Sequence, residues 1–462
     1  MKRIPGYFLG ILTIFSCISL HAEVHEYNFD NGLKLLVKED HRAPIVVSQI
    51  WYKVGSSYEH DGITGISHAL EHMMFKGTDK HPAGEFSRII AANGGRENAF
   101  TGDDFTAYFQ TMEKSRLAIS FELEADRMRN LTLPAEEFKK EIEVIKEERR
   151  LRTEDKPQRY TYEVAMATAF QTSPYRYPTV GWMADLDRMQ VSELKDWYQQ
   201  WYAPNNATVV VVGDVEPQEV YALAKKYFAG LPAEKISSNM TLPETPQLGI
   251  KRITVKRPAE VPYLLMAYKV PVLKTSIDLP DQVQEWEPYA LDVLAGVLDG
   301  GGSARFASRL VRGKEIAASV GAGYSLGSRL DNVFIISGTP SRGKSTADLE
   351  QAIKQELTAL RENPVDAKEL DRVKAQVVSS DVYEKDSVFY QGMILGLLET
   401  VGLSWRHADE YVARIQAITA EQVQAVTKKY FIDDRLTVAM LDPQPMQQQQ
   451  RSAARAGGRH AH

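Results

Sequence analysis

Residues 65–75 read GISHALEHMMF and carry two histidines, His68 and His72, four positions apart. The apolar residues around them recur at helical spacing, so the stretch predicts a helix over about 65–76. Positions i and i+4 share one face of a helix, so both imidazoles point the same way. Glu71 lies between them in the sequence and flanks that face. The stretch therefore predicts a helix that presents two imidazoles and one carboxylate together.

This combination of side chains suits a catalytic zinc ion. Such an ion has three protein ligands, often imidazoles, and an open position for water. A carboxylate beside that water can take its proton and later protonate a leaving amine. The string H-x-x-E-H is the inverted form of the H-E-x-x-H zinc signature. Alone, it leaves open a second interpretation, a helix with two incidental histidines and a surface glutamate.

A third ligand is expected to be acidic, because few other histidines remain. The helix predicted over about 135–152 is the richest source of carboxylates. Glu141 and Glu148 share one side of that helix at i and i+7, whereas Glu147 lies off that side. Helical phase alone favours Glu148 only slightly, and a solvated charged helix is the alternative.

Composition excludes several classes of protein. The 462 residues include 55 Lys and Arg against 61 Asp and Glu, a net charge of −6, with 44% hydrophobic and 25% charged residues. This length suits two to three domains, and the composition is that of a folded chain. No basic stripe marks a nucleic-acid site. A single cysteine, Cys17, excludes disulfides and cysteine-based metal sites.

The N-terminus predicts a secretory signal over residues 1–22. Lys2 and Arg3 precede an apolar run over 7–20, which ends near Ala22. Cleavage after Ala22 would leave 53 basic against 61 acidic residues, a net charge of −8. An uncleaved anchor and lipidation at Cys17 are the alternatives. No other stretch is long and apolar enough to span a bilayer, so a periplasmic or secreted protein is expected.

The remaining chain predicts one unit used twice. The tripeptide YKV at 52–54 recurs at 268–270, an offset of 216, and further pairs follow in the same order with offsets up to 230. The fold class expected is α+β, with two similar halves over 23–231 and 251–443. A polar linker over 232–250 would join them, and a low-complexity, disordered tail would occupy 444–462.

These motifs together resemble the insulinase/pitrilysin family of zinc metallopeptidases. His68-x-x-Glu71-His72 is followed by Glu148 after 75 intervening residues. The chain is most similar to the short bacterial branch that resembles mitochondrial processing peptidase. Segment 141–148 resembles the trailing family motif E-x-x-V-I-x-x-E. Further similar segments at 94–101, 202–208 and 212–214 extend the resemblance over about 26–442.

The resemblance implies a role for each residue of the metal site. His68, His72 and Glu148 would bind one Zn²⁺ per chain, which settles the helical phase in favour of Glu148. Glu71 would be the general base. Glu141 would not bind the ion itself, and its carboxylate would orient the ring of a ligand histidine.

The resemblance also implies two homologous α/β-sandwich-like halves that enclose a cavity. Within the first half, Asn98, Ala99 and Thr101 resemble the family's edge strand, onto which a peptide substrate adds by main-chain pairing. An ordinary strand and turn is the alternative interpretation of that segment.

The second half lacks the metal site. Leu291, Leu294 and Ala295 align with His68, Glu71 and His72. None of the three has a side chain that binds zinc, so the second half is expected to enclose substrate.

A substrate-binding pair in the second half is incomplete. The family has an arginine and, six or seven residues later, a tyrosine; the stretch 310–319 has Arg312, with Ala318 or Ser319 at the tyrosine position. Either Tyr324 substitutes, or a homologous partner subunit that lacks zinc supplies the missing pair.

The sequence therefore predicts a zinc-dependent metalloendopeptidase that hydrolyses peptides or unfolded polypeptides in a closed chamber. One alternative is a non-catalytic structural or assembly subunit of the same fold. Another is a catalytic subunit that is active only as a heterodimer, and a homodimer is also open.

Overall fold

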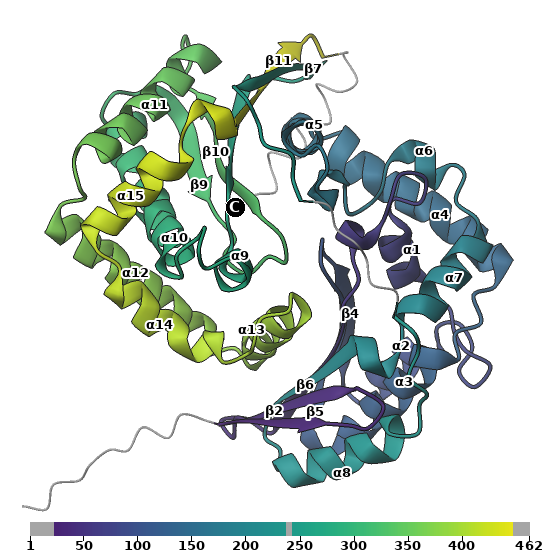
Figure 1. The fold of residues 1–462 in the computed structure, drawn as a ribbon. Coiled ribbons are helices and arrows are strands. Elements are labelled where there is room, and N and C mark those ends of the chain that lie inside the picture. The colour runs from purple at the N-terminus through teal and green to yellow at the C-terminus, as the bar shows by residue number, and fades with distance from the viewer. Residues whose placement is uncertain (1–22, 237–242, 447–462) are drawn as a thin grey trace, which may run out of the picture.

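Two mixed β-sheets, one in each half, organise the computed structural model, which describes residues 23–236 and 243–446 (Figure 1). The first sheet has the strand order β1-β2-β6-β3-β5-β4 and the second the order β7-β11-β8-β10-β9. The first sheet comprises β1 (Val24–Asn28), β2 (Lys34–Glu39), β3 (Ile45–Tyr52), β4 (Arg96–Thr101), β5 (Thr106–Glu113) and β6 (Ala207–Gly213). The second comprises β7 (Lys251–Pro258), β8 (Tyr263–Val270), β9 (Ala317–Gly323), β10 (Asn332–Pro340) and β11 (Leu436–Gln444).

The five strands of the second sheet correspond in order to five of the first, and β1 is an additional strand at the edge of the first sheet. In each, a single parallel pair, β2 with β6 and β7 with β11, lies beside a run of antiparallel pairs. The strands β6 and β11 are the last strands of their halves in sequence order, yet each lies between two strands that precede it in the chain. The sequence of β6, ATVVVVG, is buried throughout, as expected for β-branched residues in a central strand. The expected duplicated α+β fold is confirmed.

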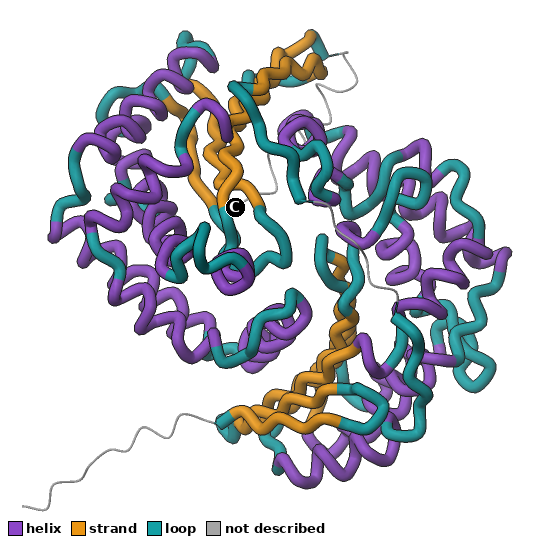
Figure 2. Tube along the Cα trace, in the orientation of Figure 1, coloured by secondary structure: helices purple, strands orange, loops and turns teal. Residues whose placement is uncertain are grey.

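Helices cover the outer side of each sheet, whereas the strands lie toward the middle of the molecule (Figure 2). The first half has α1 (Ile66–Met73), α2 (Glu85–Ala92), α3 (Leu117–Arg129), α4 (Ala135–Arg149), α5 (Pro157–Ala169), α6 (Met183–Leu186), α7 (Val191–Trp201) and α8 (Pro217–Phe228). The second has α9 (Leu273–Asp278), α10 (Trp286–Asp299), α11 (Thr346–Glu362), α12 (Ala367–Glu384), α13 (Val388–Thr400), α14 (His407–Ala417) and α15 (Ala420–Tyr430). Short single-turn helices include η1 (Ser56–Tyr58) and η4 (Pro174–Arg176).

One helix from each half packs on the sheet of the other half. The helix α5 contacts β7, β8 and β11, and α13 contacts β3 and β6 (Figure 1). Because each sheet needs a helix from the opposite half to bury its inner face, the halves are interlocked.

The contact of α13 depends on two glycines. A Cβ atom on Gly396 would lie 2.2 Å from the indole ring of Trp51 on β3, and one on Gly392 would lie 2.8 Å from the side chain of Gln49. Trp51 is fully buried, so its ring has no room to move. The helix therefore approaches the sheet as closely as its backbone allows.

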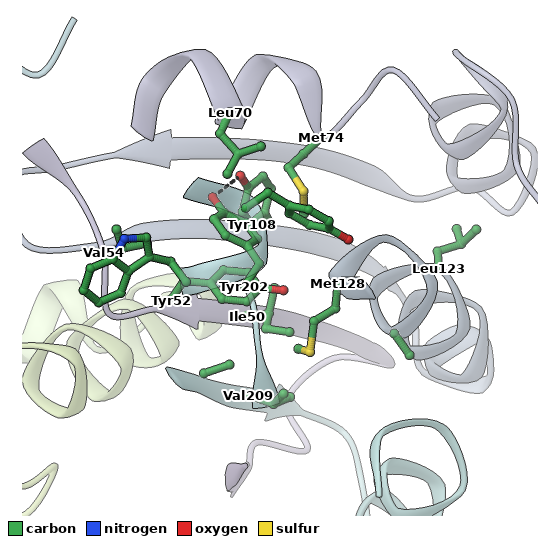
Figure 3. Packing of buried hydrophobic residues seen from close by; sticks show 14 of the residues in the cluster. Ile50, Tyr52, Val54, Leu70, Met74, Tyr108, Leu123, Met128, Tyr202 and Val209 are labelled. Carbon is green, nitrogen blue, oxygen red and sulfur yellow. Dashed lines mark hydrogen bonds between the residues drawn. The ribbon is translucent and has the colours of Figure 1, made fainter. Parts of the chain in front are cut away.

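The core of the first half joins α1 to the sheet. Tyr52, Tyr108 and Tyr202 cluster between them, and the hydroxyls of Tyr108 and Tyr202 share a hydrogen bond of 2.9 Å (Figure 3). Leu70 and Met74 on the inner side of α1 belong to the same cluster (Figure 3). The opposite side of α1 is left free to carry polar side chains.

Glu244, in the segment that precedes β7, joins the two halves. Its carboxylate accepts hydrogen bonds from the backbone N–H groups of Gln171, Thr172 and Ser173, at 2.8–2.9 Å, and from Lys269 Nζ at 2.6 Å. Burial raises the pKa of Glu244, but these hydrogen bonds outweigh burial and lower the pKa to about 2.

Several sequence predictions concern residues that the structure does not describe. The signal over 1–22, with Cys17, and most of the tail lie outside the described residues, as does the middle of the linker. The predicted domain bounds stay predictions. Within residues 23–236 and 243–446, no helix has the length and apolar character needed to cross a bilayer.

Replacing Gly396 by alanine should lower the free energy of unfolding by about 1–3 kcal/mol, because the added methyl group collides with a ring that cannot yield. Urea denaturation of the purified variant measures this change. The control is Gly230→Ala, since a Cβ atom there has no neighbour within 4 Å. Equal stability of the two variants would contradict close packing of α13 on β3.

Candidate metal centre

The helix α1 is held at its N-terminus by a buried carboxylate. Glu59 accepts hydrogen bonds from the N–H groups of Gly65, at 2.7 Å, and Ser67, at 2.9 Å. Gly65 has φ 87°, and a Cβ atom there would lie 2.4 Å from the carbonyl oxygen of Val180, so only glycine fits. Burial raises the pKa of Glu59 to about 7 despite these hydrogen bonds. The sequence analysis missed Glu59, because it lies outside the motif.

The three predicted ligands converge at the contact between α1 and α4. His72 Nε2 lies 3.3 Å from Glu148 Oε2, and His68 Nε2 lies 3.8 Å from Glu148 Oε1. One ligand atom from each residue lies within 4.8 Å of the others. Glu147 is exposed and pairs with Arg150, so the structure brings Glu148 and not Glu147 to the histidines.

These residues fit a zinc ion. Tetrahedral zinc with bonds of about 2.0–2.2 Å holds its ligand atoms roughly 3.3–3.6 Å apart, close to the separations present here. Burial and the neighbouring His72 lower the pKa of His68 to about 4, which keeps the imidazole neutral, the form that binds metal. A hydrogen bond with His72 lowers the pKa of Glu148 and keeps it ionised.

Glu141 lies one to two helical turns before Glu148 on α4 and contacts the far side of His72. Its Oε1 is 3.9 Å from His72 Nδ1, and its Oε2 forms an ion pair with Lys76 Nζ at 2.6 Å. The carboxylate therefore faces the ring nitrogen opposite the one that approaches Glu148, where it can set the orientation of the ring.

Glu71 projects beside the ligand cluster and is paired with the edge strand. The hydroxyl of Thr101, the last residue of β4, donates a hydrogen bond to Glu71 Oε2 at 2.5 Å. Burial raises the pKa of Glu71, and this hydrogen bond opposes the rise. The sequence analysis assigned Thr101 to substrate binding, whereas the structure places its hydroxyl on the predicted base.

The strand β4, which carries Asn98 and Ala99, is one of the two outer strands of the first sheet. It pairs only with β5 among the described strands, and it contacts α1. Asn98 is oriented by its own amide oxygen, which accepts a hydrogen bond from Ala99 N at 2.9 Å. The unpaired edge of β4 therefore runs past the helix that bears the metal ligands.

The second half has apolar side chains where the first has ligands. Leu291 and Leu294 on α10 are fully buried in its hydrophobic core, and Ala295 packs against them. Among the described residues, no cluster of metal-binding side chains lies on α10.

The predicted substrate-binding residues of the second half, Arg312 and Tyr324, form hydrogen bonds within that half. Arg312 is exposed and donates a hydrogen bond to the carbonyl of Gly302. The ring of Tyr324 packs against the core of the second half, and its hydroxyl donates a hydrogen bond to the carbonyl of Pro271 at 2.7 Å. Their roles toward substrate remain predictions.

A cavity of about 1450 Å³ opens between the two halves. Arg152, which forms an ion pair with Glu148, lies at its wall. The second half forms the opposite wall of this cavity. Its lining includes Leu151, Arg159, Tyr162, Arg257, Val261 and Tyr263.

This fold and site define a class of two-halved metallopeptidases, and comparison of sequences identifies the family. Residues 34–181 match the family model described as insulinase (peptidase family M16), and residues 188–377 match the model described as peptidase M16 inactive domain. The chain belongs to the insulinase, or M16, family of zinc peptidases. The resemblance predicted from the motifs is confirmed.

Several relatives are similar to this chain over almost its whole length. The zinc protease PqqE of Helicobacter pylori is 32% identical over 96% of this chain and 99% of its own. A probable mitochondrial-processing peptidase subunit beta of Arabidopsis thaliana is 26% identical over 94% and 81%. The crystal structure of a protease from Helicobacter pylori aligns with a TM-score of 0.85 and 28% identity, covering 91% of this chain and all of that one.

Replacing Glu141 by glutamine should lower zinc affinity by about 10–100-fold, because His72 loses the charge that faces its Nδ1 atom. Competition with a chromogenic chelator measures the affinity. Glu143→Gln is the matched control, since Glu143 lies on the same helix but is exposed and pairs with Lys146. Unchanged affinity in Glu141→Gln would contradict the orienting role.

Proposed function

We propose that this protein is a zinc-dependent endopeptidase that hydrolyses peptides or unfolded polypeptides in the cavity between its halves. The observation that carries the proposal is the convergence of His68, His72 and Glu148 beside Glu71, next to the free edge of β4. One zinc ion per chain would bind to the first three residues. Peptidase activity also agrees with the names of the relatives.

The edge of β4 would bind the substrate. An extended peptide can pair with the unpaired N–H and C=O groups of this strand. Because β4 contacts α1, such a peptide would run past the metal ligands with one of its carbonyls near them. Pairing along a strand edge requires an extended chain, which favours unfolded or short substrates over folded proteins.

Glu71 would carry the proton in the reaction. When bound, zinc supplies a Lewis acid, which polarises a carbonyl and makes water a stronger acid. The carboxylate of Glu71 would accept a proton from the attacking water and then deliver it to the amine that leaves. Thr101 would hold the carboxylate in place through its hydrogen bond to Oε2.

A location outside the cytoplasm, periplasmic or secreted, completes the proposal. It rests on the signal predicted over residues 1–22. The intact set of ligands and Glu71 argue against the alternative of a non-catalytic structural or assembly subunit, because such a subunit needs neither.

Replacing His72 by alanine should reduce bound zinc from one ion per chain to almost none, because two ligands do not hold the ion at low concentration. Elemental analysis after extensive dialysis measures the content. The control is His60→Ala, since the ring of His60 is exposed and hydrogen-bonds to the backbone carbonyl of Asp61. Full zinc in His72→Ala would overturn the ligand assignment.

Replacing Glu71 by glutamine should lower the turnover of peptides by about 10²–10⁴-fold, because the amide cannot accept the proton. Zinc content should stay at the wild-type value, which separates loss of the base from loss of the metal. Peptide cleavage followed by mass spectrometry is the assay. Cleavage at the wild-type rate would require a different base.

A second candidate, a catalytic subunit that needs a homologous partner, has its own support. Ala318 and Ser319 replace the expected tyrosine, and the hydroxyl of Tyr324 already donates to Pro271. A partner that lacks zinc would supply an arginine and a tyrosine over the substrate carbonyl.

For this candidate, the purified, zinc-loaded chain alone should cleave unfolded peptides weakly, and co-expression with a homologue that lacks zinc should raise the rate. The same peptide panel serves both preparations. Robust turnover by the chain alone that disappears in Tyr324→Phe would contradict the partner and assign the role to Tyr324.

A further inference from the structure

The loop between β9 and β10 carries an arginine from the second half into the first. Arg329 Nη2 donates hydrogen bonds to Ser57 Oγ, at 2.8 Å, and to the Ser57 carbonyl, at 3.2 Å. Its guanidinium carbon lies 4.3 Å from the ring centroid of Tyr58. Both residues belong to η1, which contacts α1. The second half therefore touches the structure that supports the metal-binding helix.

The centre of this contact is Asp104, which is only 4% exposed. Its Oδ1 accepts hydrogen bonds from Ser57 Oγ, at 2.7 Å, and Arg329 Nε, at 3.3 Å. Its Oδ2 accepts from the hydroxyl of Tyr175, at 2.5 Å, and from the backbone N–H of Arg329, at 3.0 Å. Without Arg329, a buried carboxylate would keep only neutral donors, which is costly for a charge.

Asp104 lies in the turn between β4 and β5, and that turn is joined to η1. Ser56 N donates to the carbonyl of Gly102, at 3.2 Å, and Ser57 N donates to that of Asp103, at 2.7 Å. A Cβ atom on Gly55 would lie 2.3 Å from the Gly102 oxygen, so the two segments touch through their backbones. The turn and η1 therefore form one rigid unit.

This unit reaches the reacting groups at both of its ends. One end is Thr101, whose hydroxyl holds Glu71. The other is Glu59, which follows η1 directly and binds the first N–H groups of α1, the helix of His68 and His72. A shift of the unit would thus move Glu71 relative to the two histidines.

We infer that Arg329 is a positioning residue for the peptidase reaction, an inference that rests on the proposed function. Docking of the second half through Arg329 onto Asp104 sets the place of Glu71 against the metal ligands. The geometry of the site then depends on closure of the two halves, so an open molecule holds zinc but carries out the reaction slowly.

The contact requires arginine rather than lysine. The planar guanidinium reaches Asp104 through Nε and Ser57 through Nη2 at once, while its face covers the ring of Tyr58. A lysine could pair with one acceptor only.

The first test measures steady-state kinetics of Arg329→Ala in the active preparation. The kcat should fall by about 10–100-fold, because a small misplacement of a reacting group has an effect of this size, while KM changes less than about threefold and zinc content stays full. Arg329→Lys should recover part of the rate. The control is Lys34→Met, which breaks a different link between the halves, from Lys34 Nζ to Glu399 at 2.7 Å, and should leave kcat within about twofold.

A double-mutant cycle tests the route to Glu71. Thr101→Val should itself lower kcat, and Arg329→Ala should have little further effect in that background, because both changes act on the same carboxylate. Effects that multiply independently would overturn the route through Thr101.

Amide hydrogen exchange tests the contact without any activity. Peptides that cover 55–59 and 101–106 should exchange at least about tenfold faster in Arg329→Ala than in the wild type or Lys34→Met. Unchanged exchange would overturn the positioning role by itself, whatever the kinetics. Absence of any turnover by the wild type would instead overturn the proposed function. Hydrogen exchange in Arg329→Ala would then still test whether Arg329 holds the two segments in place.

Discussion

The predicted ligands His68, His72 and Glu148 lie on two different helices, and their ligand atoms must come within reach of one ion. Several contacts of the first half satisfy that constraint. Glu59 and Gly65 fix the start of α1. On α4, Arg149 follows Glu148 and forms a buried, two-pronged ion pair with Glu163 on α5, at 2.7 and 2.9 Å. Because α5 packs on the second sheet, the ligand from α4 is fixed by the opposite half. A site that lies wholly on the first half thus depends on both for its shape.

Much of this arrangement follows from the sequence. The spacing of His68 and His72 places them on one helix face, and the repeated segments predict two halves with the same order of elements. The third ligand was harder, since helical phase hardly separates Glu147 from Glu148. The resemblance to the family motif favours Glu148, and the packing of α4 against α1 brings that residue to the histidines. The contacts of Thr101, Glu59 and Arg329 were not predictable from local pattern, because each joins segments whose proximity is set by tertiary packing alone.

The exchange of helices also lay beyond sequence reasoning. The sequence of α13 (VFYQGMILGLLET) is apolar on all sides, so nothing in it tells which sheet the helix covers. Gly392 and Gly396 are visible in the sequence as two small residues one turn apart. Their meaning becomes clear only against Gln49 and Trp51, more than 300 residues away in the chain. The large ring of Trp51 is buried against the bare backbone of α13, which is a specific contact. This contact fixes how the two sheets face each other.

The reciprocal exchange of α5 and α13 also bears on the origin of the chain. Two copies of one half that swap equivalent helices are the two-fold symmetric dimer expected of a shorter ancestral gene. Such a dimer would carry two metal sites facing one chamber. In a fused chain one such site can serve the shared cavity, so α10 can carry Leu291, Leu294 and Ala295 at the corresponding positions. The two halves thus share the order of their strands and the exchange of one helix, whereas the predicted metal ligands belong to the first half alone.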